Sequence, residues 1–127
     1  MEVGIKNSLS FTVDKSMTAK AAGSGTLDVL ATPVLCAFME KCAWESVSEY
    51  LADGESTVGS LIELTHLSPT PIGGTVKIDS VLEEIDRKKL TFTLTATDDA
   101  GIIGKAKHER FIISVDRFMD KANGKIS

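Results

Sequence analysis

The sequence predicts an α+β domain in which an antiparallel sheet packs against one long helix. Two observations support this prediction. A helical run begins at Thr32-Pro33 and continues to Leu51 without another Pro or Gly, and segments of alternating polarity fill most of residues 56–115. The expected order is one short strand, the helix and then four strands. With 127 residues, we expect a single domain over 1–127.

The chain before the helix carries weaker signals. Ser8–Val13 alternates apolar and polar residues and predicts a short strand. Residues 20–26 are rich in Ala, Gly, Ser and Thr, which indicates a flexible approach to the helix, although Met17–Ala22 could hold one helical turn.

The long helix is expected over residues 33–51. Thr32 can cap its free backbone N–H groups, Pro33 suits its first position, and Asp53-Gly54 offers a stop. At helical spacing, one apolar stripe carries Pro33, Cys36, Ala37, Ala43, Trp44, Val47 and Leu51. Glu40 lies within this stripe, where a carboxylate is costly to bury unless it has a partner.

Four strands are expected after the helix. In Ser56–Leu67 we expect Val58, Ile62, Leu64 and His66 on one face, with Thr57, Gly59, Glu63 and Thr65 on the other. Strands at 75–85, 90–96 and 102–115 follow, separated by the turns Asp86-Arg87-Lys88 and Asp98-Asp99-Ala100-Gly101. Tight turns between long strands predict an antiparallel meander.

Composition excludes several classes of function. The net charge of −4 and the dispersed lysines argue against nucleic-acid binding. No apolar run approaches the roughly 20 residues of a membrane span. No secretory signal is visible, so we expect a cytoplasmic protein. Cys36 and Cys42 are expected as reduced thiols, because residues six apart on a helix can hardly pair and lack metal-site spacing. No metal or other cofactor is therefore expected.

Three polar residues fall on surfaces that should be apolar. Thr32 marks the helix start, where free N–H groups can stabilise an oxyanion. Glu40 lies about 12 Å further along the helix axis. His66 shares a strand face with residues that should meet the helix. A Glu and a His in one apolar cleft could form an acid–base or nucleophile pair.

Each of these residues also has a purely structural interpretation. Thr32 could serve only as a helix cap, and Glu40 could form an ion pair with a buried Arg110 or face solvent. His66 could be structural, and His108 is the weaker functional candidate because its small neighbours indicate close packing. Gly59 within a strand indicates either close approach by a ligand or another chain, or a bulge.

Taken together, these residues resemble a known family. Three runs, VLATPVLCAFMEKCAWESV, GESTVGSLIELTHLSPTPIGGTV and KAKHERFIISVDRFMDKA, are similar to hotdog-fold thioesterases, in the group that includes the fluoroacetyl-CoA thioesterase. The resemblance implies a five-stranded antiparallel sheet wrapped around the helix. It assigns thioester cleavage to Thr32, Glu40 and His66, and acyl binding to Gly59. It further implies an acyl-CoA substrate and a homodimer in which the Ser56–Leu67 strands of two chains pair, and it leaves open whether such dimers pair into a higher oligomer.

The segment before the helix departs from that group. The fluoroacetyl-specific enzyme has a Phe-containing lid there, whereas this chain has no aromatic residue in 21–26. A different short or medium acyl group is therefore expected. The resemblance leaves open whether Glu40 attacks the carbonyl or activates water. A non-catalytic acyl-CoA or small-ligand binding protein and an enoyl-thioester hydratase are the alternative functions.

Overall fold

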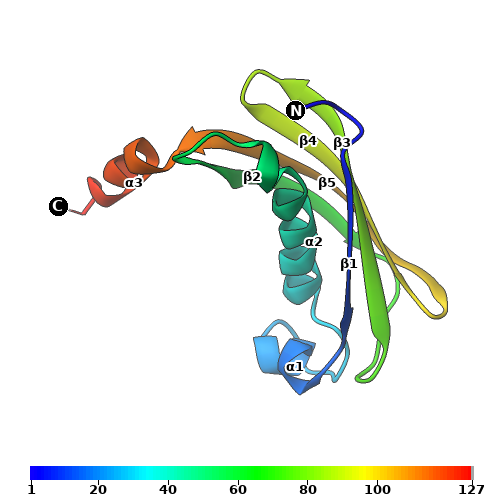
Figure 1. Ribbon diagram of the computed structural model, residues 1–127. Coiled ribbons are helices and arrows are strands. Elements are labelled where there is room, and N and C mark those ends of the chain that lie inside the picture. Colours follow the sequence, from blue (N-terminus) through cyan, green and yellow to red (C-terminus); the bar gives the residue numbers. More distant parts are fainter. Residues whose placement is uncertain (127) are drawn as a thin grey trace.

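The computed structural model describes residues 1–126, and it confirms the α+β fold class and the five-stranded antiparallel sheet. Figure 1 shows the sheet curving around one side of the long helix. The elements in chain order are β1 (Lys6–Thr12), η1 (Lys15–Met17), α1 (Ala19–Ala22), α2 (Thr32–Val47), η2 (Ser48–Tyr50), β2 (Glu55–His66), β3 (Thr75–Asp86), β4 (Lys89–Asp98), β5 (Gly101–Ser114) and α3 (Val115–Asn123).

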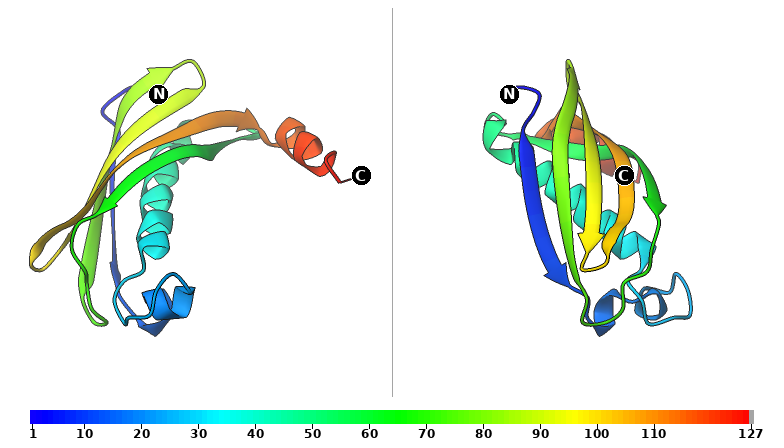
Figure 2. Two further views of the ribbon diagram at one scale, coloured as in Figure 1. Left: turned by 180° about the vertical axis from the view of Figure 1, so that it is seen from behind. Right: turned by 90° about the vertical axis from the view of Figure 1, so that its right-hand side faces the viewer.

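The strand order in the sheet is β1-β3-β4-β5-β2, which can be followed in the right-hand view of Figure 2. The expected meander is present as β3-β4-β5, joined by two tight turns. β2 pairs with β5 on one side only, so its other edge carries no strand within residues 1–126. An open edge of this length is a template for pairing with another chain.

The core lies between α2 and the concave face of the sheet. The alternation expected in β4 is confirmed, because Leu90, Phe92, Leu94 and Ala96 are buried. Val76, Ile78 and Leu82 of β3 are buried as expected. Burying these apolar side chains supplies the main driving force that holds the helix on the sheet.

Two expectations for the helix were wrong. The α-helix ends at Val47, and the chain continues as one 3₁₀ turn instead of reaching Leu51 as α-helix. The buried face consists of Leu35, Met39, Cys42, Ala43, Ser46 and Val47. The stripe expected from the sequence lies largely beside this face, with Pro33 and Ala37 exposed. Apolar residues occupy nearly the whole first half of the helix, so periodicity could not identify which side meets the sheet.

The expected faces of β2 were also partly wrong, because a β-bulge interrupts the strand. Gly59 pairs with Arg110 and Leu61 pairs with Glu109, which leaves Ser60 as the extra residue. One extra residue reverses the alternation. Thr57 and Gly59 therefore face the helix together with Ile62, Leu64 and His66, whereas Val58 does not.

The helical turn that Met17–Ala22 could hold is present as the short helix α1, and the 3₁₀ turn η1 precedes it. The sequence reading did not include α3 at the end of the chain. After β5, α3 projects away from the sheet on the side of α2 (Figures 1 and 2). Within residues 1–126, no helix is both long and apolar enough to cross a membrane.

Candidate active site

Thr32 and His66 lie in direct contact. Thr32 Oγ1 is 2.8 Å from His66 Nδ1. The expected helix cap was wrong, since Ala31 occupies the cap position and no side-chain cap is formed. Pro33 in the first turn still fits a helix start. The Thr32 hydroxyl is therefore directed to the end of β2 instead of to the backbone of its own helix.

His66 has one ring nitrogen without a partner. Its Nε2 atom is buried and makes no hydrogen bond with the described residues. Burial lowers the pKa of His66, which favours the neutral ring at neutral pH. A neutral imidazole that is already held through Nδ1 can accept or donate a proton through Nε2, depending on its tautomer.

The Thr32–His66 pair lines a cavity of about 330 Å³. Ala19 and Ser24 form another part of its wall, and they belong to the segment that precedes α2. Small side chains thus line the part of the cavity that this segment provides.

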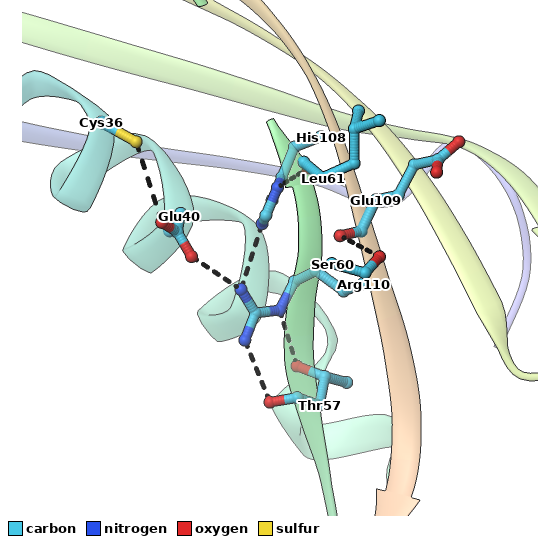
Figure 3. A network of polar contacts seen from close by, with 8 residues as sticks. All are labelled: Cys36, Glu40, Thr57, Ser60, Leu61, His108, Glu109 and Arg110. Carbon is cyan, nitrogen blue, oxygen red and sulfur yellow. Dashed lines mark hydrogen bonds and ion pairs between the residues drawn. The ribbon is translucent and has the colours of Figure 1, made fainter. Parts of the chain in front are cut away.

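Glu40 lies in a separate network and contacts neither Thr32 nor His66 in the protomer. Its Oε2 atom is 3.4 Å from Arg110 Nη1, and its side chain is 39% exposed. The ion pair with Arg110, one of the interpretations open from the sequence, is therefore present. Figure 3 shows both groups between α2 and the strands β2 and β5.

Arg110 is fixed from several sides. Its Nε and Nη2 atoms donate to the hydroxyl and the carbonyl oxygen of Thr57, at 2.9 and 3.0 Å. Only 8% of its side chain is exposed. Burial lowers the pKa of Arg110, but the nearby Glu40 carboxylate opposes that shift, and arginine remains charged in proteins. Glu40 therefore faces a cation that can hardly move.

His108 completes this network as a neutral acceptor. Its Nδ1 lies 2.7 Å from the Leu61 carbonyl oxygen, to which it donates, and its Nε2 accepts from Arg110 Nη1 at 3.1 Å. Burial first, and Arg110 next among the lowering causes, depress the pKa of His108. The expected close packing of His108 is confirmed, because the residue is 1% exposed.

Cys36 donates a second hydrogen bond to Glu40, in addition to the one from Arg110. Its Sγ atom lies 3.8 Å from Glu40 Oε1, one helical turn away. Burial, and then the Glu40 charge, raise the pKa of Cys36. The thiol therefore stays protonated at neutral pH and each carboxylate oxygen of Glu40 has one donor (Figure 3). Both cysteines are free, as expected.

Gly59 provides the space for this arrangement. A Cβ atom at position 59 would lie 2.9 Å from Glu40 Oε2 and 3.2 Å from His108 Cε1. Gly59 also lines a pocket of about 180 Å³ together with Glu40, Leu61, Ile62 and His108. A bulge was one of the alternatives that the sequence left open for Gly59, and it is present directly after this residue. Because the bulge reverses the alternation of side chains, Gly59 lies on the side of β2 that faces Glu40.

The sequence reading missed Thr57 and underrated His108. Both face the helix in the structure, but Thr57 was assigned to the opposite face because the bulge was not placed. Its β-branched polar side chain gave no separate signal. Within residues 1–126, no group of three His, Cys, Asp or Glu side chains is arranged to hold a metal ion.

Comparison with known proteins identifies the family. Residues 13–116 match the sequence model of the FlK family, which is described as fluoroacetyl-CoA-specific thioesterase. This chain belongs to the FlK family. A curated relative, the fluoroacetyl-CoA thioesterase of Streptantibioticus cattleyicolor, is 32% identical over 98 residues, which cover 77% of this chain and 70% of the relative.

Solved structures agree with the FlK assignment. A structure of the fluoroacetyl-CoA thioesterase FlK superimposes with a TM-score of 0.94 at 28% identity, covering 100% of this chain and 98% of that one. A hot-dog-like protein from Thermanaerovibrio acidaminovorans gives a TM-score of 0.91 at 20% identity, with 98% and 93% covered. The latter likeness shows the hotdog fold alone.

Proposed function

We propose that this member of the FlK family is an acyl-CoA thioesterase that hydrolyses a short or medium acyl thioester to the free acid and thiol. Two observations support this proposal. The chain belongs to the FlK family, and Arg110 and Cys36 hold the Glu40 carboxylate beside a small pocket. The pocket of about 180 Å³ supports a small acyl group. A variant of FlK has been crystallised with acetyl-CoA.

We assign the catalytic roles to Thr32, Glu40 and His66, with Gly59 as an acyl-binding residue. The thioester carbonyl lies beside Glu40, and in a two-chain site the backbone N–H groups at the start of α2 of the other chain can stabilise its oxygen. Glu40 either takes a proton from the attacking water, or attacks the carbonyl carbon to form an acyl anhydride that water then hydrolyses to the free acid and the Glu40 carboxylate. The C–S bond breaks when the tetrahedral intermediate collapses, and the proton that water loses passes through His66 to the thiolate. Thr32 orients His66 through their hydrogen bond.

The separation of Glu40 from His66 in one protomer supports a homodimer. When two copies of β2 pair antiparallel about a two-fold axis, the C-terminal end of one strand lies beside the N-terminal half of the other. The partner's His66 then approaches the Gly59 region, which Glu40 faces. The open edge of β2 and the exposed Pro33 and Ala37 of α2 offer a surface for such a partner.

Two further assignments belong to this proposal. We regard residues 1–127 as one catalytic domain, and we place the protein in the cytoplasm as a homodimer that can pair further. Sedimentation of the active protein tests the assembly, because a species of two 13.6 kDa chains or more is expected. A monomer with full activity would contradict the two-chain site.

The experiment that tests the function measures thiol release from acyl-CoAs of increasing chain length. Glu40→Gln and His66→Ala should each lower kcat by at least about 100-fold, since general acid–base groups contribute on that order. Glu45→Gln is the matched control, because Glu45 is an exposed carboxylate on the same helix. Its turnover should equal that of the wild type.

The same assay separates the alternative functions. Acyl-CoA that binds and is recovered intact would indicate a binding protein. Loss of an enoyl-CoA double bond without thiol release would indicate a hydratase. Undiminished hydrolysis by both Glu40→Gln and His66→Ala would remove the proposed roles while leaving the activity itself established.

A further inference from the structure

The two oxygens of the Glu40 carboxylate have different partners. Oε2 lies 3.4 Å from Arg110 Nη1, and Oε1 lies 3.8 Å from Cys36 Sγ. Figure 3 shows the two donors on different sides of the carboxylate, with Cys36 on the preceding turn of α2 and Arg110 on β5. The oxygens are therefore chemically distinct before any substrate is bound.

Arg110 favours a charged, unprotonated Oε2. An arginine side chain has donors only and does not lose its own proton in proteins. A proton on Oε2 would weaken the charge-assisted hydrogen bond from Nη1. The ring of His108 offers no alternative, because its Nε2 atom already accepts from the same Nη1 at 3.1 Å. A protonated Oε2 would therefore find no free acceptor in the network of Arg110 and His108.

Cys36 can serve Oε1 in both protonation states of Glu40. Burial, and then the Glu40 charge, raise the pKa of Cys36, so the thiol carries a proton that it can donate to the carboxylate. When Oε1 takes up a proton, the S–H group can turn away and Sγ can accept, since a thiol sulfur is also a weak acceptor. Oε2 meanwhile continues to accept from Arg110. A proton on Oε1 therefore disrupts fewer interactions than a proton on Oε2.

The place of Cys36 on the helix agrees with a role beside Glu40. Thr32, Cys36 and Glu40 follow one another at intervals of four residues, so they lie along one side of α2. The side of α2 that packs on the sheet carries the other cysteine, Cys42, which is fully buried, whereas Cys36 is only partly buried. The Cys36 thiol thus belongs to the side of α2 that carries the candidate catalytic groups.

We propose that Oε1 is the reacting oxygen of Glu40 and that Cys36 is the positioning residue that holds it. The proposal rests on the proposed thioesterase function. If Glu40 is a base, Oε1 takes the proton of the water whose oxygen bonds to the carbonyl carbon, and gives that proton up again toward His66. If Glu40 is a nucleophile, Oε1 itself forms the bond to the carbonyl carbon. Cys36 keeps its own proton in both cases.

Cys36→Ala and Cys36→Ser separate this role from packing. Steady-state thiol release from acetyl-CoA gives kcat and KM, and thermal unfolding gives the stability. Alanine removes the donor and the acceptor, so kcat should fall about five- to tenfold, the effect of one lost hydrogen bond, while KM changes less than about twofold. Serine offers a hydroxyl with both capacities and should recover kcat to within about threefold of the wild type. Both residues fill less space than cysteine, so a packing role would impair the two variants equally.

Cys36→Leu tests which oxygen reacts. Leucine is a good helix former, and its branched side chain would crowd Oε1. Reaction at Oε1 predicts that kcat falls at least about tenfold below that of Cys36→Ala, because the reacting atoms are displaced. Equal kcat values in the leucine and alanine variants would assign the reaction to Oε2 and overturn the proposal. Cys42→Ala is the matched control, because Cys42 contacts the Ile78 carbonyl oxygen instead of Glu40, and its kcat should equal that of the wild type.

Infrared spectroscopy follows the contact without any substrate. The difference between the spectra of the wild type and Cys36→Ala isolates the S–H stretching band of Cys36. This band should shift when Glu40→Gln is introduced into both proteins, because an amide is a weaker acceptor than a carboxylate. The S–H band of Cys42 should stay where it is. A Cys36 band that does not shift would overturn the proposal, whatever the catalytic activity.

The outcomes separate this proposal from the proposed function. Wild-type hydrolysis together with an unchanged kcat in Cys36→Ala would overturn the role of Cys36 and leave the thioesterase intact. Equal losses in Cys36→Ala and Cys36→Ser would indicate packing and would also overturn it. A wild type that releases no thiol from any acyl-CoA would remove the proposed function, and the role of Oε1 in the reaction with it.

Discussion

At the scale of single residues, the site depends on how few positions the Glu40 carboxylate can occupy. Arg110 and Cys36 each donate to one of its oxygens, and the absence of a side chain at Gly59 leaves the space that the carboxylate occupies beside β2. Arg110 is itself held by Thr57 and His108. A reacting group that is fixed before the substrate arrives loses little entropy in the reaction.

Gly59→Ala tests this restriction. The added methyl group would meet Glu40 Oε2 at 2.9 Å, so the carboxylate must move. We expect kcat to fall at least about tenfold, because small displacements of a reacting group are costly, whereas the folded structure is retained. The measurement is steady-state thiol release together with thermal unfolding. Full activity with normal stability would show that Glu40 tolerates another position.

The residue types of the site were visible in the sequence, but not all of their contacts. Thr32, Glu40 and His66 stood out because each is polar on an apolar pattern. The Glu40–Arg110 pair remained one of two possibilities, since β5 and α2 are far apart in the sequence and only the fold joins them. The hydroxyl of Thr32 could equally have capped the helix, and local sequence does not decide between the two hydrogen bonds.

At the scale of elements, α2 shows where periodicity is insufficient. The beginning of the helix was predicted correctly from Pro33. The predicted buried face, however, is rotated about the helix axis relative to the face that is buried in the structure. A helix that is apolar on several sides fits more than one orientation. The orientation is decided by packing against β3 and the other strands, which is tertiary information.

A pair of substitutions in α2 checks the observed face. Leu35→Ala should lower the free energy of unfolding by about 2–5 kcal/mol, because Leu35 is fully buried. Ala37→Ser should change it by at most about 1 kcal/mol, because Ala37 is exposed in the protomer and serine is only a slightly weaker helix former than alanine. Urea denaturation measures both. Equal effects would place the core side of the helix where the sequence pattern put it.

The helix α3 carried a signal that was available in the sequence. Val115, Phe118, Met119 and Ala122 recur at helical spacing, and charged residues occupy the remaining positions. The expected final strand ended at Val115, one residue past Ser114, where β5 ends.

At the scale of the whole molecule, the architecture was the most predictable property. The alternation in β3 and β4 and the turns between the strands specify a meander, and one long helix must cover its apolar face. The five strands were expected from alternation, and the resemblance to a known family added that they form one sheet wrapped around the helix. The assembly is less predictable than the architecture, since an open strand edge shows where a partner can bind but does not show which partner binds.

Stability should depend on pH through the two histidines. Burial lowers the pKa of both His66 and His108 in the folded protein, so the unfolded chain takes up protons first as the pH falls below about 6.5. Unfolding then binds protons, and stability decreases with falling pH through the folded pKa values. Urea denaturation between pH 7.5 and 5.5 measures this decrease.

Replacing one histidine provides the control for that prediction. His66→Gln removes one of the two titrating groups, so the free energy of unfolding should depend less steeply on pH than in the wild type. A stability that stays constant or rises as the pH falls across this window would contradict the assignment of neutral, buried rings.

The bulge at Ser60 has a consequence for evolution within this family. Gly59 and His66 are seven positions apart, so a regular strand of this length would present them on opposite sides. Deleting Ser60 would remove the bulge and leave Gly59 and His66 six positions apart, still on one face of a straighter strand. The extra residue therefore adds a local bend to β2, and a one-residue change of length in this stretch can be made without turning Gly59 away from Glu40 only if the bulge is lost with it.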